Sequence, residues 1–101
     1  MVRIKLVGCN FHPASKKTIE NEVVKVMREP NNKFDKNAIV VKNSLGETIG
    51  YVGTSKTVSI GNRNNGCIDN LQLGNLMKDN FAVRGIVTKF RDYFGFIEVD
   101  L

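Results

Sequence analysis

The chain has 101 residues, of which 15 are basic and 10 acidic, and its formal net charge at pH 7 is +5. This length fits one compact domain, expected over residues 1–101, and a composition of 42% hydrophobic and 25% charged residues excludes intrinsic disorder. No apolar run reaches the roughly 20 residues that cross a bilayer, and no apolar leader opens the chain, so we expect a cytoplasmic protein that does not associate with membranes.

Six segments carry the alternation of apolar and polar residues, or the short apolar run, that is typical of β-strands. In chain order they are residues 2–8, 22–29, 38–42, 47–53, 81–90 and 93–99. The polar segment 10–21 is expected to be a loop, and residues 43–46 a hairpin connection. Residues 54–66 are expected to be the least structured stretch, whereas residues 67–77 place apolar side chains at near-helical spacing. The predicted fold is therefore mainly β with one or two short helices, arranged as a small antiparallel barrel.

One connection between two predicted strands is chemically unusual. It lies within Arg28-Glu-Pro-Asn-Asn-Lys-Phe-Asp-Lys-Asn-Ala-Ile39 and combines an aromatic ring, a carboxylate, basic groups and amides. Simple hairpins use two to five turn residues and usually a glycine, whereas this connection is longer and has none. Two interpretations stay open: the polar residues form a binding site, or Asp35 and Asn37 only hold the shape of the loop.

This run resembles the HIRAN domain, which is found at the N-terminus of helicase-like remodellers and as small stand-alone bacterial proteins. The family pattern is Arg-Glu/Asp-Pro-Asn-Asn-x-aromatic-Asp-x-Asn-Ala-Ile, followed after a hairpin by Gly-x-x-Ile/Val-Gly-Tyr/His-Val/Ile. Both halves occur in order, at residues 28–39 and as Gly46-Glu-Thr-Ile-Gly-Tyr-Val52. The resemblance implies an OB-like six-stranded antiparallel β-barrel that binds single-stranded DNA, in characterised members at a free 3′ end.

The resemblance also implies a set of nucleic-acid-binding residues: Phe11, Asn31, Asn32, Phe34, Asp35, Tyr51 and Lys56. Within the loop, the two asparagines and Asp35 match the positions that hold the terminal sugar hydroxyl and nearby backbone. Phe34 matches the aromatic that flanks the terminal bases. A carboxylate would repel phosphate, so Asp35 fits a DNA site as the acceptor of a sugar hydroxyl.

The remaining members of this set lie outside the loop. Tyr51 matches a polar aromatic or imidazole beside phosphate, and Phe11 matches a second stacking aromatic. Where the family places a lysine three residues beyond Tyr51, this chain has Thr54, with Lys56 as the nearest substitute. Asn10 stands where some members have arginine, so end-specificity is less secure than nucleic-acid binding. A cationic rim around the site is expected from Lys16, Lys17, Lys33, Lys36 and Lys56.

The expected function is a non-enzymatic module that recognises single-stranded DNA, and its free 3′ end, in DNA repair, replication or processing. It would need no cofactor, and a helicase or nuclease is the expected protein partner. Two alternatives stay open: a protein-interaction adaptor built on the same barrel, and a metal-dependent DNA-processing hydrolase, which the lack of clustered histidines and carboxylates disfavours. Oligomeric state and the choice between DNA and RNA are left undetermined.

Two further motifs are given structural interpretations. The segment 91–99 resembles the aromatic strand of cold-shock domains, but it lacks the preceding Lys-Gly, and we expect Phe94 and Phe96 to pack inside the barrel. Cys9, His12 and Cys67 fall short of the four ligands of a closed zinc site. We therefore expect no metal and two free thiols, with a single disulfide bridge or a redox role as the alternative.

Overall fold

The computed structural model describes residues 1–58 and 66–101. Its strands are β1 (Val2–Val7), β2 (Val23–Arg28), β3 (Ile39–Lys42), β4 (Thr48–Val52), β5 (Cys67–Ile68), β6 (Ala82–Arg91) and β7 (Phe94–Val99). Its helices are the 3₁₀ segments η1 (Cys9–Phe11) and η2 (Pro13–Lys17) and the α-helices α1 (Ser55–Val58) and α2 (Asn70–Met77). None of the helices in these two ranges is long and apolar enough to cross a membrane.

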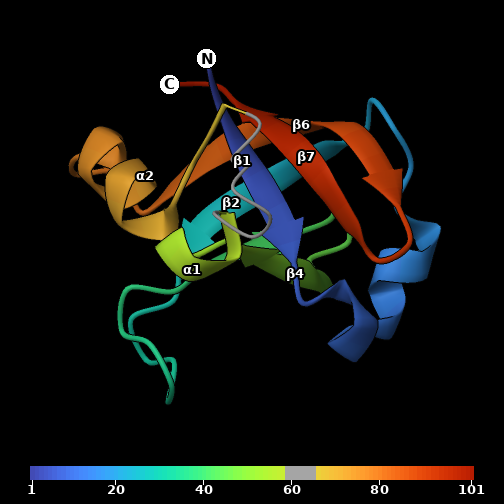
Figure 1. Cartoon of the computed structure of the whole chain (residues 1–101), viewed down its shortest axis with the longest axis horizontal. Helices are drawn as coiled ribbons and strands as arrows, with labels where there is room; N and C mark the ends of the chain where they lie inside the picture. Colours follow the sequence, from blue (N-terminus) through green and yellow to red (C-terminus); the bar gives the residue numbers. More distant parts are fainter. Residues whose placement is uncertain (59–65) are drawn as a thin grey trace.

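The strands form a closed barrel, as the sequence predicts. Neighbouring strands follow the order β4-β3-β2-β6-β7-β1, and β1 pairs with β4 to complete the circle of six antiparallel strands. The short β5 adds to β1 in parallel (Figure 1). At the closure, a Cβ on Gly50 would lie 2.7 Å from the carbonyl oxygen of Val7. The glycine of the second motif is therefore required where β1 crosses β4.

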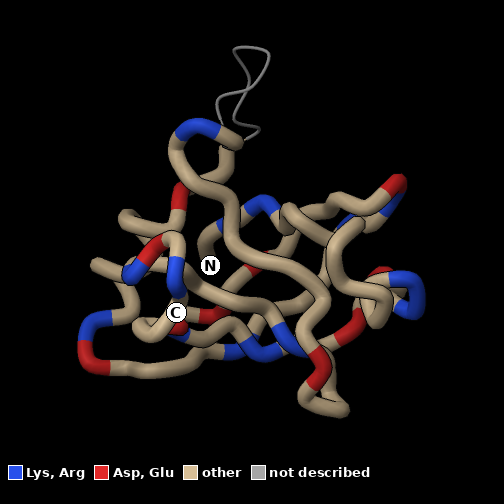
Figure 2. Tube along the Cα trace, turned by 90° about the horizontal axis from the view of Figure 1, so that it is seen from below, with Lys and Arg blue, Asp and Glu red and all other residues tan. Residues whose placement is uncertain are grey.

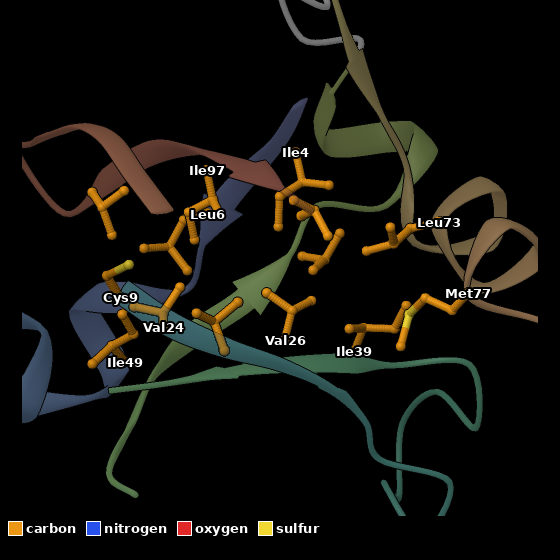
Figure 3. Packing of buried hydrophobic residues seen from close by; sticks show 14 residues of the cluster. Ile4, Leu6, Cys9, Val24, Val26, Ile39, Ile49, Leu73, Met77 and Ile97 are labelled. Carbon is orange, nitrogen blue, oxygen red and sulfur yellow. The ribbon is translucent and has the colours of Figure 1, made fainter. Parts of the chain in front are cut away.

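The core fills the inside of this barrel with aliphatic side chains. Val24 and Val26 of β2 point inward, and three consecutive β3 residues, 39–41, are all buried, as the sequence predicts. Leu73 and Met77 of α2 lie at one end of the buried cluster (Figure 3), and Cys9 of η1 lies at the other. The two ends of the barrel are thus closed by helical segments.

Helix α2 is fixed at both ends by side chains. Asp69 accepts a hydrogen bond from the backbone N–H of Gln72, whose side chain accepts one from the N–H of Asp69, forming a capping box. At the other end, the Arg28 guanidinium donates to the carbonyl oxygens of Gly74 and Lys78, at 2.9 and 2.8 Å. The first residue of the long motif therefore anchors α2 to β2.

Three local expectations need correction. Segment 10–21 is not a plain loop, because the fixed φ of Pro13 opens η2, and the buried hydroxyl of Ser15 donates to the carbonyl of Cys9 at 2.9 Å. Segment 54–66 begins with the single turn of α1, and its residues 59–65 lie outside the described residues. Phe94 and Phe96 do not pack inside the barrel: Gly95 and Ile97 face inward, so strand alternation places both rings outside.

Candidate functional site

The loop between β2 and β3 is organised around one asparagine. The Oδ1 of Asn32 accepts hydrogen bonds from the backbone N–H groups of Phe34 and Asp35, at 2.9 and 3.0 Å. Its Nδ2 donates to Oε1 of Glu29 at 2.8 Å. These three bonds use both sides of the amide, so Asn32 holds the loop in one shape.

Glu29 connects this loop to the barrel wall. The same Oε1 that accepts from Asn32 accepts from the Tyr51 hydroxyl on β4 at 2.6 Å. Burial of the phenol, followed by this hydrogen bond, raises the pKa of Tyr51 to about 12. Tyr51 therefore stays neutral at physiological pH and donates its proton inward to Glu29. The expected phosphate contact of this hydroxyl would have to compete with that bond.

Asp35 is held by contacts from both of its carboxylate oxygens. Oδ1 accepts from the backbone N–H of Asn37 at 2.8 Å, and Oδ2 accepts from Nδ2 of Asn70 at 3.2 Å. Asn70, the first residue of α2, is buried and also donates to the carbonyl of Asn37 at 3.0 Å. The carboxylate is thus fixed in position but, with about four acceptor sites in total, it keeps capacity for a ligand donor.

A cleft of about 230 Å³ lies beside these anchored groups. Its lining includes four of the seven predicted binding residues: Asn32, Phe34, Asp35 and Tyr51. Phe34 projects almost entirely into solvent, with 97% of its surface exposed. An aromatic ring at the tip of a well-bonded loop contributes no burial to stability, so the local structure does not explain why it is there.

The other three predicted residues lie around this cleft and not in its lining. Asn31 is exposed in the turn beside Asn32, and Lys56 is exposed on α1, next to the cleft residue Thr57. Phe11 is 78% exposed on η1. Its neighbour His12 lies 5.7 Å from Tyr51 between ring centroids, which places η1 beside the cleft wall.

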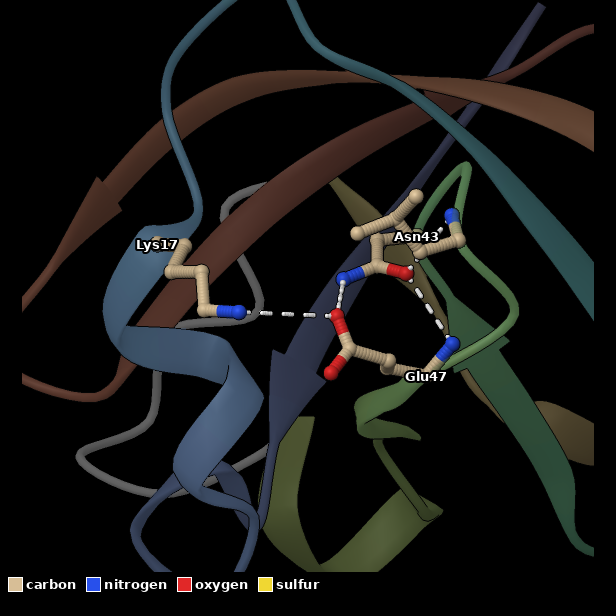
Figure 4. Close-up of polar contacts among 4 residues, drawn as sticks. Lys17, Asn43 and Glu47 are labelled. Carbon is tan, nitrogen blue, oxygen red and sulfur yellow. Dashed lines mark hydrogen bonds and ion pairs between the residues drawn. The ribbon is translucent and has the colours of Figure 1, made fainter.

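The predicted cationic rim is only partly assembled. Figure 2 shows Lys and Arg spread around the whole trace among acidic residues. Lys17, the last residue of η2, extends toward the β3–β4 turn, and its ammonium lies 3.8 Å from the Glu47 carboxylate, which also accepts from Asn43 (Figure 4). That turn is at the end of β4 away from Tyr51, so Lys17 does not belong to the rim. Lys33, Lys36 and Lys56 are exposed on the loop and on α1.

Sequence reasoning missed two groups that position the site. Glu29 lies inside the quoted motif, but nothing local indicates that a tyrosine 22 residues away bonds to it. Asn70 is 35 residues from Asp35, and its only sequence signal is its place inside the segment 67–77 that is predicted to be helical. A buried asparagine at a helix start needs partners, and that requirement is the clue that could have identified it.

The cysteines and His12 form no metal site among the described residues, where no cluster of three or more His, Cys, Asp or Glu side chains occurs. Both cysteines are free and buried. Burial raises the pKa of the Cys9 thiol to about 11, so the thiolate required for metal binding or nucleophilic attack is disfavoured.

Comparison with known proteins gives one family and one fold. The family model described as HIRAN domain matches residues 1–65. Over 32 residues the chain is 56% identical to the helicase-like transcription factor of Oryctolagus cuniculus, a match that spans 32% of this chain but only 3% of that protein.

Two solved structures share the architecture. The crystal structure of the HIRAN domain of human HLTF superposes with a TM-score of 0.64 at 22% identity, covering 97% of this chain and 71% of that one. A protein from Lactobacillus plantarum superposes with a TM-score of 0.75 at 19% identity, covering 98% and 89%. At these identities the likeness establishes the fold, so the site has to be argued from its own residues.

Proposed function

The chain belongs to the HIRAN domain family, and from that premise we propose that it is a non-enzymatic module that binds single-stranded DNA by its free 3′ end. The binding site is the cleft between the β2–β3 loop, the end of β4 and the start of α2. In this proposal the module works in the cytoplasm and brings a helicase or nuclease partner to DNA ends during repair, replication or processing.

The observation that carries the proposal is the contrast between a fixed loop and its exposed tip. Phe34 is 97% exposed while the backbone on which it stands is bonded to Asn32. Such a ring is a ready stacking surface, and stacking a base on an aromatic side chain contributes roughly 1–3 kcal/mol whatever the base. The fixed backbone reduces the entropy lost when the base binds.

Asp35 supplies the preference for an end. Asp35 lines the cleft and its carboxylate accepts two hydrogen bonds, which leaves acceptor capacity for a ligand. A 3′-hydroxyl is a donor that only the last sugar of a DNA strand carries. A 3′-phosphate at the same place would put negative charge against the carboxylate. The site therefore selects a hydroxyl end over a phosphorylated one.

The other predicted residues take two kinds of role. Asn32 and Tyr51 shape the cleft, because their polar groups are bonded to the loop and to Glu29. Asn31, Lys56 and Phe11 are exposed nearby and contact the sugar-phosphate backbone or a base of the bound strand.

Oligonucleotides that differ only at their 3′ end test this proposal. Strands ending in a hydroxyl, a phosphate or a blocking group are titrated against the protein at one fixed salt concentration, because phosphate contacts make affinity salt-dependent. The hydroxyl end is expected to bind most tightly. Equal affinity for all three ends would contradict specific recognition of the 3′-hydroxyl, and no binding to any strand would contradict the proposed function itself.

A further inference from the structure

The outer face of the sheet formed by β1, β7 and β6 carries aromatic and basic side chains that neither the core nor the cleft uses. The three strands lie side by side (Figure 1), with β7 in the middle. Opposite residues of antiparallel strands share a face, and on β7 the outward residues include both phenylalanines. We call this surface the outer-face patch; its members are Arg3, Lys5, Lys89, Arg91, Phe94 and Phe96.

The register of the strands sets these side chains in rows across the sheet. Phe96 stands opposite Lys5 on one side and Lys89 on the other. Phe94 stands opposite Arg91. Each ring of the central strand is therefore flanked by cationic groups of the neighbouring strands. Aromatic rings next to cations suit a single-stranded nucleic acid, whose bases stack and whose phosphates are negative.

The two rings are held by contacts with the cations and with each other. Phe94 and Phe96 meet edge to face with centroids 6.1 Å apart. The Lys5 ammonium lies 5.4 Å from the Phe94 centroid, and the Arg3 guanidinium lies 5.9 Å from that of Phe96. These contacts keep the rings on the sheet surface, where Phe94 remains 43% exposed.

The charge of the patch is mostly positive. Among the described residues, its one ion pair joins Arg3 to Glu98 at 3.2 Å, while Lys89 and Arg91 pair with no acidic side chain. Lys89, Arg91 and the two phenylalanines also line a depression of about 330 Å³, whose lining includes one acidic residue, Glu20.

Lys5 joins this patch to the proposed end-binding cleft. Its Nζ donates to the carbonyl oxygen of Thr57 at 3.4 Å, and Thr57 lines the cleft. The same ammonium sits over the Phe94 ring. The Lys5 side chain therefore contacts both surfaces, so the cleft and the outer-face patch are adjacent and form one continuous surface for a bound strand.

We propose that the outer-face patch binds the stretch of the single strand that runs 5′ from the end held in the cleft. This inference rests on the proposed function. Its bases stack on Phe96 and Phe94, and its phosphates follow Lys89 and Arg91 on one side and Arg3 and Lys5 on the other. The protein then has a site of several nucleotides, within the roughly 4–16 that one OB-type barrel covers.

The test compares 3′-hydroxyl strands of two lengths, about 3 and about 12 nucleotides, where only the longer fills a multi-nucleotide site. The wild type is expected to bind the longer strand more tightly. Phe96→Ala is expected to weaken the longer strand by about 5- to 150-fold, the range of one lost base stack, and to leave the shorter unchanged. Phe81→Ala, which removes a half-exposed ring outside the patch, is the control and leaves both unchanged.

A charge variant makes the test independent of the aromatic substitution. Lys89→Ser with Arg91→Ser is expected to weaken the longer strand and to lower its log–log salt slope by about 1.4, two phosphate contacts at about 0.7 each. The control, Lys25→Ser with Arg84→Ser, removes the same two charge types from a directly opposed pair on β2 and β6. It leaves the salt slope close to that of the wild type. Thermal unfolding confirms that all four variants are folded.

The outcomes separate this inference from the proposed function. Equal affinity of the wild type for both lengths, or equal effects of the two charge variants, overturns the outer-face path while end binding stands. Binding of neither strand overturns the proposed function and the path with it. A length dependence that only the Phe96 and Lys89/Arg91 variants remove supports the path.

Discussion

The two connections that flank β3 are stabilised by the same local hydrogen-bond pattern, but they differ in what they present to solvent. In the β2–β3 loop, Asn32 accepts from two backbone N–H groups and donates to Glu29. In the β3–β4 turn, Asn43 accepts from the N–H groups of Leu45 and Glu47 and donates to the Glu47 carboxylate at 3.0 Å (Figure 4). An asparagine–glutamate pair of this kind is therefore a way of making a turn and does not by itself indicate a binding site.

What differs is the surroundings of each glutamate. Glu29 reaches Tyr51 on the barrel wall, beside a carboxylate fixed by α2 and a fully exposed ring. Apart from Asn43 in its own turn, the Glu47 side chain meets, among residues 1–58 and 66–101, the exposed ammonium of Lys17. A binding role is therefore inferred from what a loop presents and from what fixes it. For the loop tips, the asparagines and the second partners of the glutamates, a variant of one connection is matched by a control variant in the other.

The largest effect is expected at the loop tips. Phe34→Ala removes the stacking surface and is expected to cost roughly 1–3 kcal/mol of binding to a 3′-ended strand. Leu45→Ala, at the 76% exposed tip of the other turn, is expected to leave binding unchanged. Both should leave the free energy of unfolding within about 0.5 kcal/mol of wild type, because neither side chain is buried. Fluorescence titration measures the DNA affinity, and chemical denaturation measures the free energy of unfolding. Equal DNA affinity of the two variants would contradict a special role of the β2–β3 loop.

The two asparagines come next. Asn32→Ala and Asn43→Ala each remove a side chain that satisfies two backbone N–H groups, and each is expected to lower the free energy of unfolding by roughly 0.5–2 kcal/mol. Only Asn32→Ala should also weaken DNA binding, because the proposed site lies in that loop and not in the β3–β4 turn. Denaturant unfolding and oligonucleotide titration of both variants check this. A binding loss of equal size in Asn43→Ala would show that stability, and not the loop, controls affinity.

The second partners of the two glutamates, the Tyr51 hydroxyl and the Lys17 ammonium, are also expected to differ. Tyr51→Phe removes a partly buried hydrogen bond to a carboxylate. It should lower the free energy of unfolding by at most roughly 1.5–3 kcal/mol, because solvent that reaches the site weakens the bond. Lys17→Ala removes an exposed ion pair with Glu47, whose atoms are 3.8 Å apart, and should lower the free energy of unfolding by between 0 and about 0.5 kcal/mol. Chemical denaturation of the two variants compares the costs directly, and a larger cost for Lys17→Ala would contradict the structure.

The weakest effect is expected from pH, through Tyr51. Its folded-state pKa of about 12 lies above the ordinary tyrosine pKa of 10.0, so the folded protein holds this proton more tightly than the unfolded chain. Its contribution to stability is fully present below pH 10 and is lost as pH rises through about 12. The difference in tyrosinate absorbance between the wild type and Tyr51→Phe should therefore develop near pH 12. A difference that develops near pH 10 would mean that the phenol is not bonded to Glu29.

Much of the barrel could be predicted because strand signals are local. Alternation in β1 and β2 and the continuous apolar run of β3 depend only on neighbouring residues. Phe94 and Phe96 were wrongly predicted to pack inside the barrel, because their apolar side chains suggested the core. Gly95 and Ile97 face inward, so the alternation of the strand places both rings on the outer face.

The site was less predictable for the same reason. Its residues within the loop are close in sequence, and a resemblance could identify them. The contacts that fix the loop, from Asn70 to Asp35 and from Tyr51 to Glu29, join segments that only the closed barrel brings together. Sequence reasoning therefore indicated a candidate site in this loop but not the groups that hold the loop in place.

The central claim is that the Asp35 carboxylate reads the hydroxyl at a 3′ end, and one paired titration tests it most directly. Wild type and Asp35→Ala are each titrated with strands of the same sequence that end in a 3′-hydroxyl or a 3′-phosphate. The wild type should prefer the hydroxyl end, and Asp35→Ala should lose that preference by binding the hydroxyl end less tightly and the phosphate end no worse. An Asp35→Ala variant that keeps the wild-type preference would contradict the claim.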